Sequence, residues 1–363
     1  MKVKDITQAI ELMVPLYLQE SWDNSGMQVG DPESEITGVL LCTDVREEIV
    51  DEAIERGANL IISHHPLLFR GLKKIVGRSY QERIVTRAIK HDITIYCAHT
   101  NMDSAVGGVN FKMAEKIGLK NVQVLDRQQG TQLKVVVFVP IEAASQVEKA
   151  MCEAGAGRLG NYDSSSYSMN GEGHYRPLDG AEPWSGEVGT VHHEPEVRLE
   201  VLANKALCSK VITAMLKAHP YEEPAFDIIA LENSDKYAGL GVIGDIEPQN
   251  AHDFLEKVKK AFEVKTLRYS GNLDRKISCI AMCGGAGSEF IGIAMSQGAD
   301  VYITGDMKYH EFQGNEDRII LVDIGHYESE HYTKEIFYDI IQKKNPNFAV
   351  DFARSETNQV KYL

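Results

Sequence analysis

Histidines and carboxylates stand at the ends of two neighbouring apolar runs in the first third of the chain. His64 and His65 close the run NLIISHH, and His99 and Asp103 follow ITIYCA. An isolated histidine pair is more often a strand cap beside an exposed side chain. Two successive runs that end this way favour a functional site, because functional groups gather beyond the carboxyl ends of strands in open α/β sheets.

A third group lies near the far end of the chain, in LVDIGHYESEH (321–331). A strand is predicted over 318–325, and His326 and Glu330 begin the helix that follows it. Residues four apart share one face of a helix, so this pair can coordinate a single metal centre. Taken alone, such a pair is more often a cap or a surface pair. Glu328 and His331 are expected to be solvated.

Together, the three places supply three imidazoles and two carboxylates: His64, His65, Asp103, His326 and Glu330. Mixed nitrogen and oxygen ligands favour Zn, which is our first expectation, or Fe, Mn or Co. Five ligands suit two divalent metals roughly 3.5–4 Å apart, a pair that lowers the pKa of a bridging water and so supplies a nucleophile. No cysteine is near, which argues against a closed structural zinc site and for open positions and catalysis.

Other polar residues rank lower as site candidates. Asp306 and His310 follow a strand end in the second half, and each could transfer protons or orient a metal ligand. His99 is either such an orienting partner or a core histidine. The segment Trp22–Asp23–Asn24 could line the cleft or anchor the N-terminal segment, and we favour the anchor. The Gly-rich CGGAGSE (283–289) precedes a helix and could cradle a phosphate, but backbone packing is the more common reason for such glycines.

The candidate ligands depend on elements that alternate between strand and helix. Runs at 38–43, 59–64 and 93–100 lack apolar/polar alternation, as strands buried on both faces do, and helical patterns separate them. The same order returns at 279–285, 300–306 and 318–325. An offset of 241 residues takes Cys42 to Cys283 and aligns both halves without a gap. We therefore predict a duplicated α/β/α layered domain.

The middle of the chain has a different order of elements, βαβ followed by βαβ, which predicts a ferredoxin-like α+β domain. The predicted division is residues 1–128 and 234–363 for the two halves of the α/β domain, with the insert at 129–233. Tyr221, Glu222 and Glu223 of the insert could bind a small effector, although an ordinary strand entry is the more common explanation.

The composition of the chain limits the partners and the compartment that we expect for it. A net charge of −15 makes DNA an unlikely partner, because phosphate binding needs clustered Lys and Arg. Six scattered cysteines indicate reduced core thiols and a cytoplasmic protein. No apolar run reaches the roughly 20 residues of a membrane span, and the amphipathic N-terminal segment is unlike a signal peptide.

Five motifs in order resemble the NIF-three-like family, often labelled type-two GTP cyclohydrolase homologs: WDNSGMQVGD (22–31), SHHPLLF (63–69), AHTNMD (98–103), YITGDMKYHE (302–311) and DIGHYESE (323–330). The resemblance covers both halves, and the insert is similar to the PII and CutA domains of larger bacterial members. It implies that His64, His65, Asp103, His326 and Glu330 bind a dinuclear metal centre. It also implies a ring-like homohexamer.

Two functions fit these observations. The first is a metal-dependent hydrolase, acting on GTP as the family label implies or on phosphoesters. The second is a metal-containing regulatory protein without turnover, because PII-like domains sense small molecules. Its ligand would be a nucleotide or small metabolite.

Overall fold

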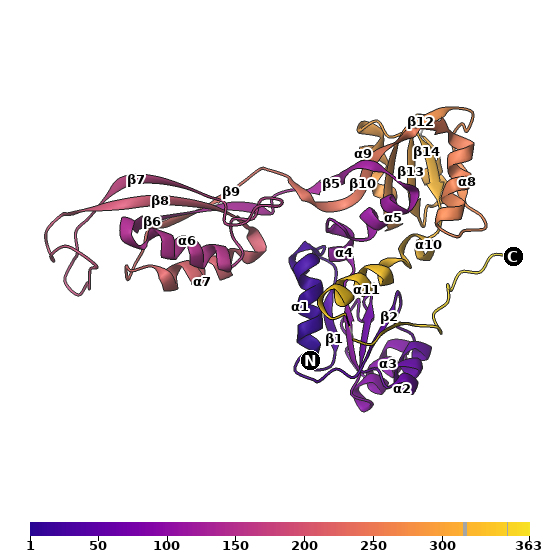
Figure 1. The fold of residues 1–363 in the computed structure, drawn as a ribbon, viewed down its shortest axis with the longest axis horizontal. Helices are drawn as coiled ribbons and strands as arrows, with labels where there is room; N and C mark the ends of the chain where they lie inside the picture. Colours follow the sequence, from indigo (N-terminus) through magenta and orange to yellow (C-terminus); the bar gives the residue numbers. More distant parts are fainter. Residues whose placement is uncertain (315–317, 347) are drawn as a thin grey trace. The chain divides into compact units, whose positions relative to one another are not determined.

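The computed structural model describes residues 1–314, 318–346 and 348–363 (Figure 1). The chain divides into two compact units. The first unit joins Met1–Arg127 to Lys236–Leu363, and the second, inserted unit is Gln128–Asp235. All five candidate metal ligands belong to the first unit.

One sheet of the first unit has the order β1 (Gly26–Val29), β4 (Thr94–Cys97), β3 (Leu60–Ser63), β2 (Val39–Cys42) and β15 (Val350–Phe352). Its strands are parallel except for β1. Every residue of β2, β3 and β4 is buried, which explains their unbroken apolar runs. Helices α2 (Glu47–Arg56) and α3 (Tyr80–Lys90) pack against one face of the sheet. Helices α1 (Val3–Met13) and α11 (Thr333–Lys344) pack against the other.

The second sheet has the order β11 (Arg268–Ser270), β14 (Ile320–Asp323), β13 (Val301–Gly305), β12 (Lys276–Ala286), β10 (Asp235–Asn250) and β5 (Lys120–Gln128). Strands β12, β13 and β14 are parallel. Helix α9 (Ile291–Ser296) covers one face, and α5 (Val109–Ile117) and α8 (Ala251–Ala261) cover the other. Each half is therefore an α/β/α sandwich, as predicted.

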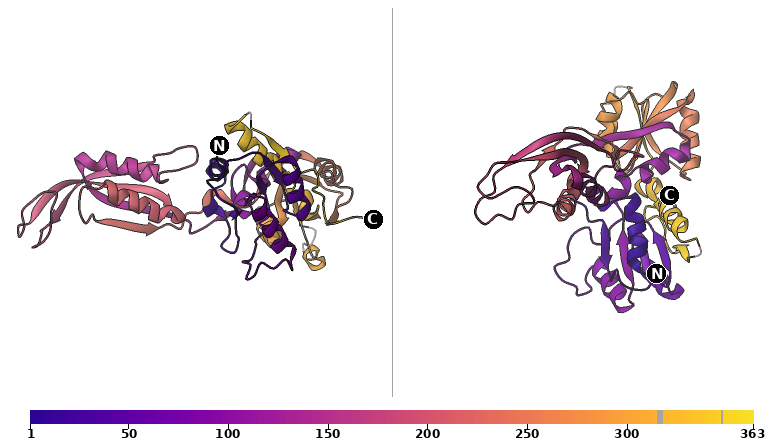
Figure 2. Two further views of the ribbon diagram at one scale, coloured as in Figure 1. Left: turned by 90° about the horizontal axis from the view of Figure 1, so that it is seen from below. Right: turned by 60° about the vertical axis from the view of Figure 1, so that its left-hand side comes forward.

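The inserted unit runs β6 (Gln132–Pro140), α6 (Ala144–Glu153), β7 (Ser166–Tyr175), β8 (His192–Asn204), α7 (Cys208–Ala218) and β9 (Phe226–Ala230). Its sheet has the order β7-β8-β6-β9, and all pairs are antiparallel. Both helices cover one face of this sheet (Figure 2). This topology is the predicted ferredoxin-like split βαβ. Short 3₁₀ helices complete the chain: η1 (Leu16–Leu18), η2 (Ile141–Ala143), η3 (Lys205–Leu207), η4 (Ser288–Phe290) and η5 (Tyr309–Phe312).

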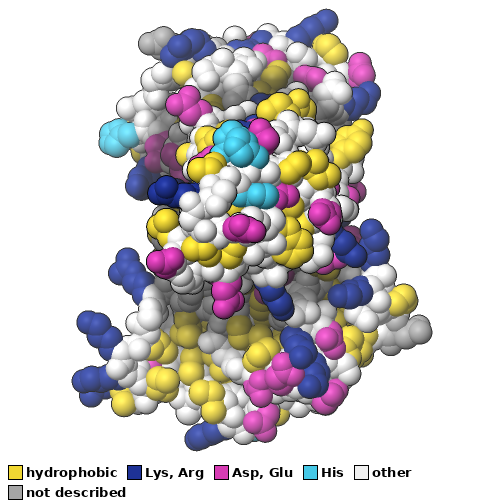
Figure 3. All heavy atoms as spheres, turned by 90° about the vertical axis from the view of Figure 1, so that its left-hand side faces the viewer, with side chains coloured by type: hydrophobic (Ala, Val, Ile, Leu, Met, Phe, Trp, Pro, Cys, Tyr) yellow, Lys and Arg dark blue, Asp and Glu magenta, His cyan; other side chains and the backbone are white. Residues whose placement is uncertain are grey.

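On the face shown in Figure 3, basic, acidic and hydrophobic side chains are interspersed. Among the described residues, no helix has the length and apolar character that crossing a bilayer requires.

The two halves of the first unit share strand register as well as element order. Val39 pairs with Leu60 in the first sheet, and Ile280 pairs with Val301 in the second. An offset of 241 residues relates these pairs, as it does Cys42 and Cys283. The predicted duplication is confirmed, because an unrelated strand pair would have no reason to keep the same register.

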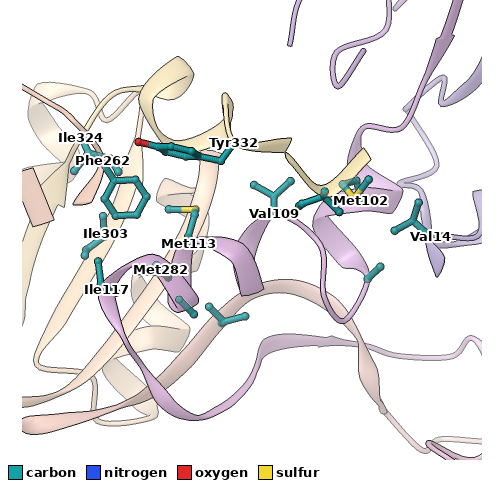
Figure 4. Close-up of a cluster of buried hydrophobic side chains, with 14 of the residues drawn as sticks. Val14, Met102, Val109, Met113, Ile117, Phe262, Met282, Ile303, Ile324 and Tyr332 are labelled. Carbon is teal, nitrogen blue, oxygen red and sulfur yellow. The ribbon is translucent and has the colours of Figure 1, made fainter. Parts of the chain in front are cut away.

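Side chains from both sheets meet in one core, which fixes the two sets of strand ends relative to each other. Leu41 and Ile62 of the first sheet belong to the same buried cluster as Met282 and Ile303 of the second. Figure 4 shows part of this cluster, with Met102 of helix α4 (Thr100–Ser104) among its members. Asp103 directly follows Met102 in α4, so core packing also positions a candidate ligand.

Candidate metal centre

Three strand ends bring the five predicted ligands together. His64 and His65 directly follow β3, and Asp103 lies in α4, just beyond β4. Strand β14 ends at Asp323, and α10 (His326–Glu330) begins and ends with the other two candidates. The two sheets contribute these ends from opposite halves of the duplicated unit.

The carboxylate of Glu330 lies between two groups of ligand atoms. Its Oε1 is 3.7 Å from His64 Nε2, which is itself 3.7 Å from Asp103 Oδ1. Its Oε2 is 2.9 Å from His65 Nε2 and 3.0 Å from His326 Nε2. Within each group the ligand atoms lie within 4.8 Å of one another. One carboxylate therefore serves two sets of potential metal ligands, one oxygen to each.

Two atoms of the first group are buried without a hydrogen-bond partner, His64 Nε2 and Asp103 Oδ1. The His64 ring is fully buried, and its Nδ1–H donates to the carbonyl oxygen of Ala98 at 2.9 Å. That bond leaves the lone pair of Nε2 facing the cluster. Unpaired buried polar atoms are costly, and a bound cation would satisfy both, so the residues present fit a metal ion.

Two carboxylates contact the other two imidazoles at Nδ1, the ring nitrogen that does not face Glu330. Asp44 Oδ1 is 2.8 Å from His65 Nδ1, and Asp306 Oδ2 is 2.8 Å from His326 Nδ1. Such contacts fix the ring orientation of metal-binding histidines and raise their basicity. Sequence reasoning missed Asp44, although it follows β2, and the strand-end argument applied there would have selected it.

The pKa values of the two carboxyl groups in the cluster are shifted in opposite directions. Burial opposes ionisation of Glu330, but His64, His326 and His65 hold the pKa of its carboxyl well below its usual range. Burial, and then the charge of Glu330, raise the pKa of Asp103 well above its usual value. The two carboxylates cannot both ionise cheaply without a nearby cation.

The other imidazoles of the cluster respond to the same surroundings. Burial lowers the pKa of His64. Burial would also lower the pKa of His326, but the hydrogen bond that His326 donates to Glu330, and the negative charge of Glu330, raise this pKa to about 9.

Glycines make room for Glu330. Gly285 has φ +63°, and a Cβ there would lie 2.3 Å from Glu330 Oε1. Its N–H donates to Ser329 Oγ at 2.9 Å, which ties β12 to α10. The glycines of CGGAGSE, interpreted from sequence as a packing feature, thus pack against the cluster itself.

His99 lies beside the cluster. One of its ring nitrogens is within 4.8 Å of ring nitrogens of both His64 and His65. Its Nδ1 is 2.8 Å from Asp23 Oδ1, and Asp23 also accepts from the N–H of Thr100 at 3.0 Å. Asp23 thus anchors the N-terminal segment, as predicted, and orients His99 as well.

Two exposed aromatic rings border His99. Trp22 and Phe69 have exposed fractions of 57% and 45%, and their ring centroids are 5.8 Å apart. The Trp22 and Phe69 centroids lie 6.3 and 6.5 Å from that of His99. These rings form an accessible aromatic surface next to the cluster, with their planes tilted 52° to each other.

The remaining candidates lie at different distances from the cluster. The contact between Asp306 and His326 supports an orienting role for Asp306. His310 lies in η5, is exposed, and has its Nδ1 3.4 Å from Gln313 Oε1. It belongs to none of the ligand groups found among the described residues.

The expectation that Glu328 and His331 are solvated is wrong. Glu328 accepts from Asn358 Nδ2 at 2.8 Å. The His331 ring packs against Tyr327 and Tyr332, with centroids 5.3 and 3.7 Å away. Tyr327 and Tyr332 are close in sequence, whereas Asn358 belongs to the distant C-terminal segment, which local spacing did not reveal.

A cavity of about 420 Å³ adjoins one side of the cluster. His326 and Asp306 line it, together with Arg268, Tyr327 and Tyr362. A molecule in this cavity would contact a ligand residue directly.

The duplicated sandwich and its cluster define an α/β protein whose buried histidines and glutamate could hold metal ions. The chain belongs to the DUF34/NIF3 (NGG1p interacting factor 3) family, whose model matches residues 1–360. This confirms the resemblance seen in the five motifs.

Similar proteins cover nearly the whole chain. A Halalkalibacterium halodurans protein named "GTP cyclohydrolase 1 type 2 homolog" is 41% identical over 324 residues, 88% of this chain and 87% of that protein. A Bacillus subtilis protein of the same name is 38% identical over 98% of this chain and 96% of its own. The crystal structure of a Bacillus cereus protein related to NIF3 is 38% identical, with a TM-score of 0.83, and covers 100% of this chain and 99% of that one.

Proposed function

We propose that this chain binds two divalent metal ions and is a metal-dependent hydrolase. The observation that carries the proposal is the Glu330 carboxylate, which turns one oxygen to His64 and the other to His65 and His326. One ion would be held by His64, Asp103 and Glu330, and the other by His65, His326 and Glu330. Nitrogen-rich ligands favour Zn, with Fe, Mn and Co as alternatives.

The ions would supply Lewis acidity and lower the pKa of a coordinated water towards neutrality. The protein's own contribution is orientation and proton transfer. Asp44 and Asp306 hold the rings of His65 and His326 in place. His99 can accept or return a proton at Nε2, because Asp23 fixes its Nδ1 and it lies next to the ligand residues.

We propose a nucleotide as the substrate class. The two relatives named above are called GTP cyclohydrolase homologs. Independently, the exposed pair of Trp22 and Phe69 offers a stacking surface for a planar base beside the cluster. Hydrolysis of a purine ring or of a phosphoester bond is compatible with such an arrangement.

The test is a side-by-side screen of wild type, Glu330→Gln and Asp103→Asn against nucleotides, including GTP, and generic phosphoesters. Each substitution keeps the size of the side chain and removes a charge that holds metal. Glu335→Gln is the matched control, because it alters a carboxylate of the next helix, away from the cluster and its cavity. We expect turnover in wild type and Glu335→Gln only, at measured metal occupancy. Full turnover by metal-free Glu330→Gln would refute the proposal.

Metal analysis must separate the cluster from a second group. Glu172, His174 and His193 of the inserted unit are exposed and also have ligand atoms within 4.8 Å of one another. A His174→Ala/His193→Ala variant removes this group. Two metals per chain should remain in it, and fewer than one should remain in Glu330→Gln built on the same background.

A second function is a metal-containing regulatory protein that binds a nucleotide or metabolite without turnover. The observation favouring it is a cavity of about 610 Å³ within the inserted unit. Fully metallated wild type that turns over nothing in the screen but binds a nucleotide tightly would place this function first.

We further propose a cytoplasmic, ring-like homohexamer, as the sequence resemblance implies. The six cysteines are free thiols, which suits a reducing compartment. Light scattering should give about six times the subunit mass of 40.4 kDa. A single species near one subunit mass would contradict the assembly.

A further inference from the structure

The inserted unit contains a cavity that has no part in the metal centre. Its volume is about 610 Å³, within the range of small-molecule sites. Its floor is the sheet face left open by the helices, where Phe138, Glu196 and Arg198 line it. The segment 176–191 between β7 and β8 forms a wall, and Tyr221 and its neighbours form another.

Aromatic rings line this cavity on several sides. Phe138 and Tyr175 come from the sheet, Trp184 from the long connection, and Tyr221 from the segment before β9. The Tyr175 and Tyr221 rings lie 5.9 Å apart at 66°. Arg198 already places its guanidinium carbon 5.6 Å from the Phe138 ring, so this surface accepts a cation.

A buried carboxylate faces the same space, and no cationic side chain among the described residues forms an ion pair with it. Glu196 is only 8% exposed, and its Oε1 accepts the O–H of Tyr221 at 2.9 Å. Across the described residues, no Lys, Arg or His forms an ion pair with it. Burial and this carboxylate raise the pKa of the Tyr221 phenol, so it remains a neutral donor. A buried carboxylate whose one hydrogen-bonding side chain is a phenol leaves room for a cation to pair with it.

We propose that the cavity binds a small organic ammonium ion, with the cation beside Glu196 and among the aromatic rings. The charged lining is acidic in balance, with four carboxylates (Glu172, Glu196, Glu222 and Glu223) against two guanidiniums (Arg176 and Arg198). Arg198 also donates through Nε to Glu200 at 2.9 Å, which offsets its charge. Carboxylates combined with aromatic faces are the surroundings in which proteins recognise alkylammonium groups.

The cavity is preformed. The Tyr175 O–H donates to the carbonyl oxygen of Ser185 at 3.0 Å, and the N–H of Glu182 donates to Glu222 at 3.0 Å. Gly171 lines the floor without a side chain. A Cβ added there would meet nothing within 4 Å, so the space beside it is open. A ligand would therefore bind without first ordering the wall segment. This site does not depend on the proposed hydrolase activity.

Tryptophan fluorescence of the full-length protein provides the assay. The chain has two tryptophans, Trp22 in the first unit and Trp184 in the cavity wall. Choline is the probe, and 3,3-dimethyl-1-butanol is its uncharged counterpart of the same shape. We expect a saturable response to choline that is absent in Trp184→Phe and at least about tenfold weaker with the neutral alcohol.

The variants separate a specific site from general charge effects. Glu196→Gln keeps an acceptor for Tyr221 and removes the charge, so choline affinity should fall about tenfold or more. Glu187→Gln removes a charge from the same segment outside the cavity and should bind as wild type does. Cooperative denaturant unfolding, followed by Trp184 fluorescence in a Trp22→Phe background, should be retained in both and shows that the inserted unit is folded. Equal binding of choline by Glu196→Gln, equal binding of the neutral alcohol, or no saturable response to choline or tetramethylammonium would each overturn the proposal.

Discussion

The close approach of β12 to Glu330 can be tested with Gly285→Ala. A methyl group there would lie 2.3 Å from Glu330 Oε1 and 3.2 Å from its Cδ, far inside contact distance. The carboxylate must move, and it is the one group that faces both sets of ligands. We therefore expect metal affinity to fall at least about 100-fold, the upper end of what altering an outer partner of a metal ligand costs.

Gly298→Ala is the matched control for backbone strain. Gly298 also has a positive φ, +80°, but an added Cβ meets nothing within 4 Å. Both variants should lose about 1–2 kcal/mol of unfolding free energy in the metal-free state, because a left-handed conformation costs a non-glycine residue that much. Only Gly285→Ala should also lose metal.

Two measurements on chelator-treated protein check this: denaturant unfolding, and titration with Zn²⁺ against a competing chelator. Wild-type affinity in Gly285→Ala would refute the idea that Glu330 is a ligand held against this backbone. Equal loss of metal in Gly298→Ala would show that strain, rather than the local clash, is responsible.

Asp306→Ala should weaken metal binding about 10–100-fold, because His326 Nδ1 loses its acceptor. Asp306→Asn should restore most of the affinity, because an amide oxygen still accepts from His326 Nδ1. Wild-type affinity of Asp306→Ala in the Zn²⁺ titration would exclude the orienting role. Asp300 accepts from the N–H groups of Ser278 and Cys279, and although burial opposes ionisation, these bonds and Arg275 lower its pKa below the ordinary 3.8. Its stabilisation is therefore present above pH 3.8 and lost as pH falls through the lowered pKa. Asp300→Asn should cost about 1–3 kcal/mol of unfolding free energy at pH 7, and a difference from wild type that persists undiminished in strong acid would contradict this. Replacing residues 129–233 with a short Gly/Ser linker should leave a remainder that unfolds cooperatively and keeps its metals, because every candidate ligand lies in the first unit; an insoluble or metal-free product would show that the insert is integral to the site.

Much of the fold could be predicted because its signals are local. Strands β2, β3 and β4 are buried along their whole length, so their sequences carry no alternation and indicate a parallel sheet. The gapless repeat at 241 residues indicated two equivalent halves. The order of elements in the insert indicated its ferredoxin-like topology.

The choice of His64, His65, Asp103, His326 and Glu330 also came from local order. Polar residues placed directly after apolar strands must lie at one edge of a parallel sheet, whatever the detailed packing. The helical spacing of four put His326 and Glu330 on one face. Those residues were therefore identifiable before any distance was known.

Tertiary structure alone decided which of these residues contact one another. His65 and Glu330 are 265 positions apart and 2.9 Å in space, because side chains of both sheets pack into one core. The same packing directs one oxygen of Glu330 to each ligand group. It also brings Asp44 against His65 Nδ1 and Gly285 against the Glu330 carboxylate. Glu196 of the insert likewise meets Tyr221, 25 positions away, only in the folded unit. Periodicity records which face of an element is buried, but not what lies against it, since that depends on side chains far away in the sequence.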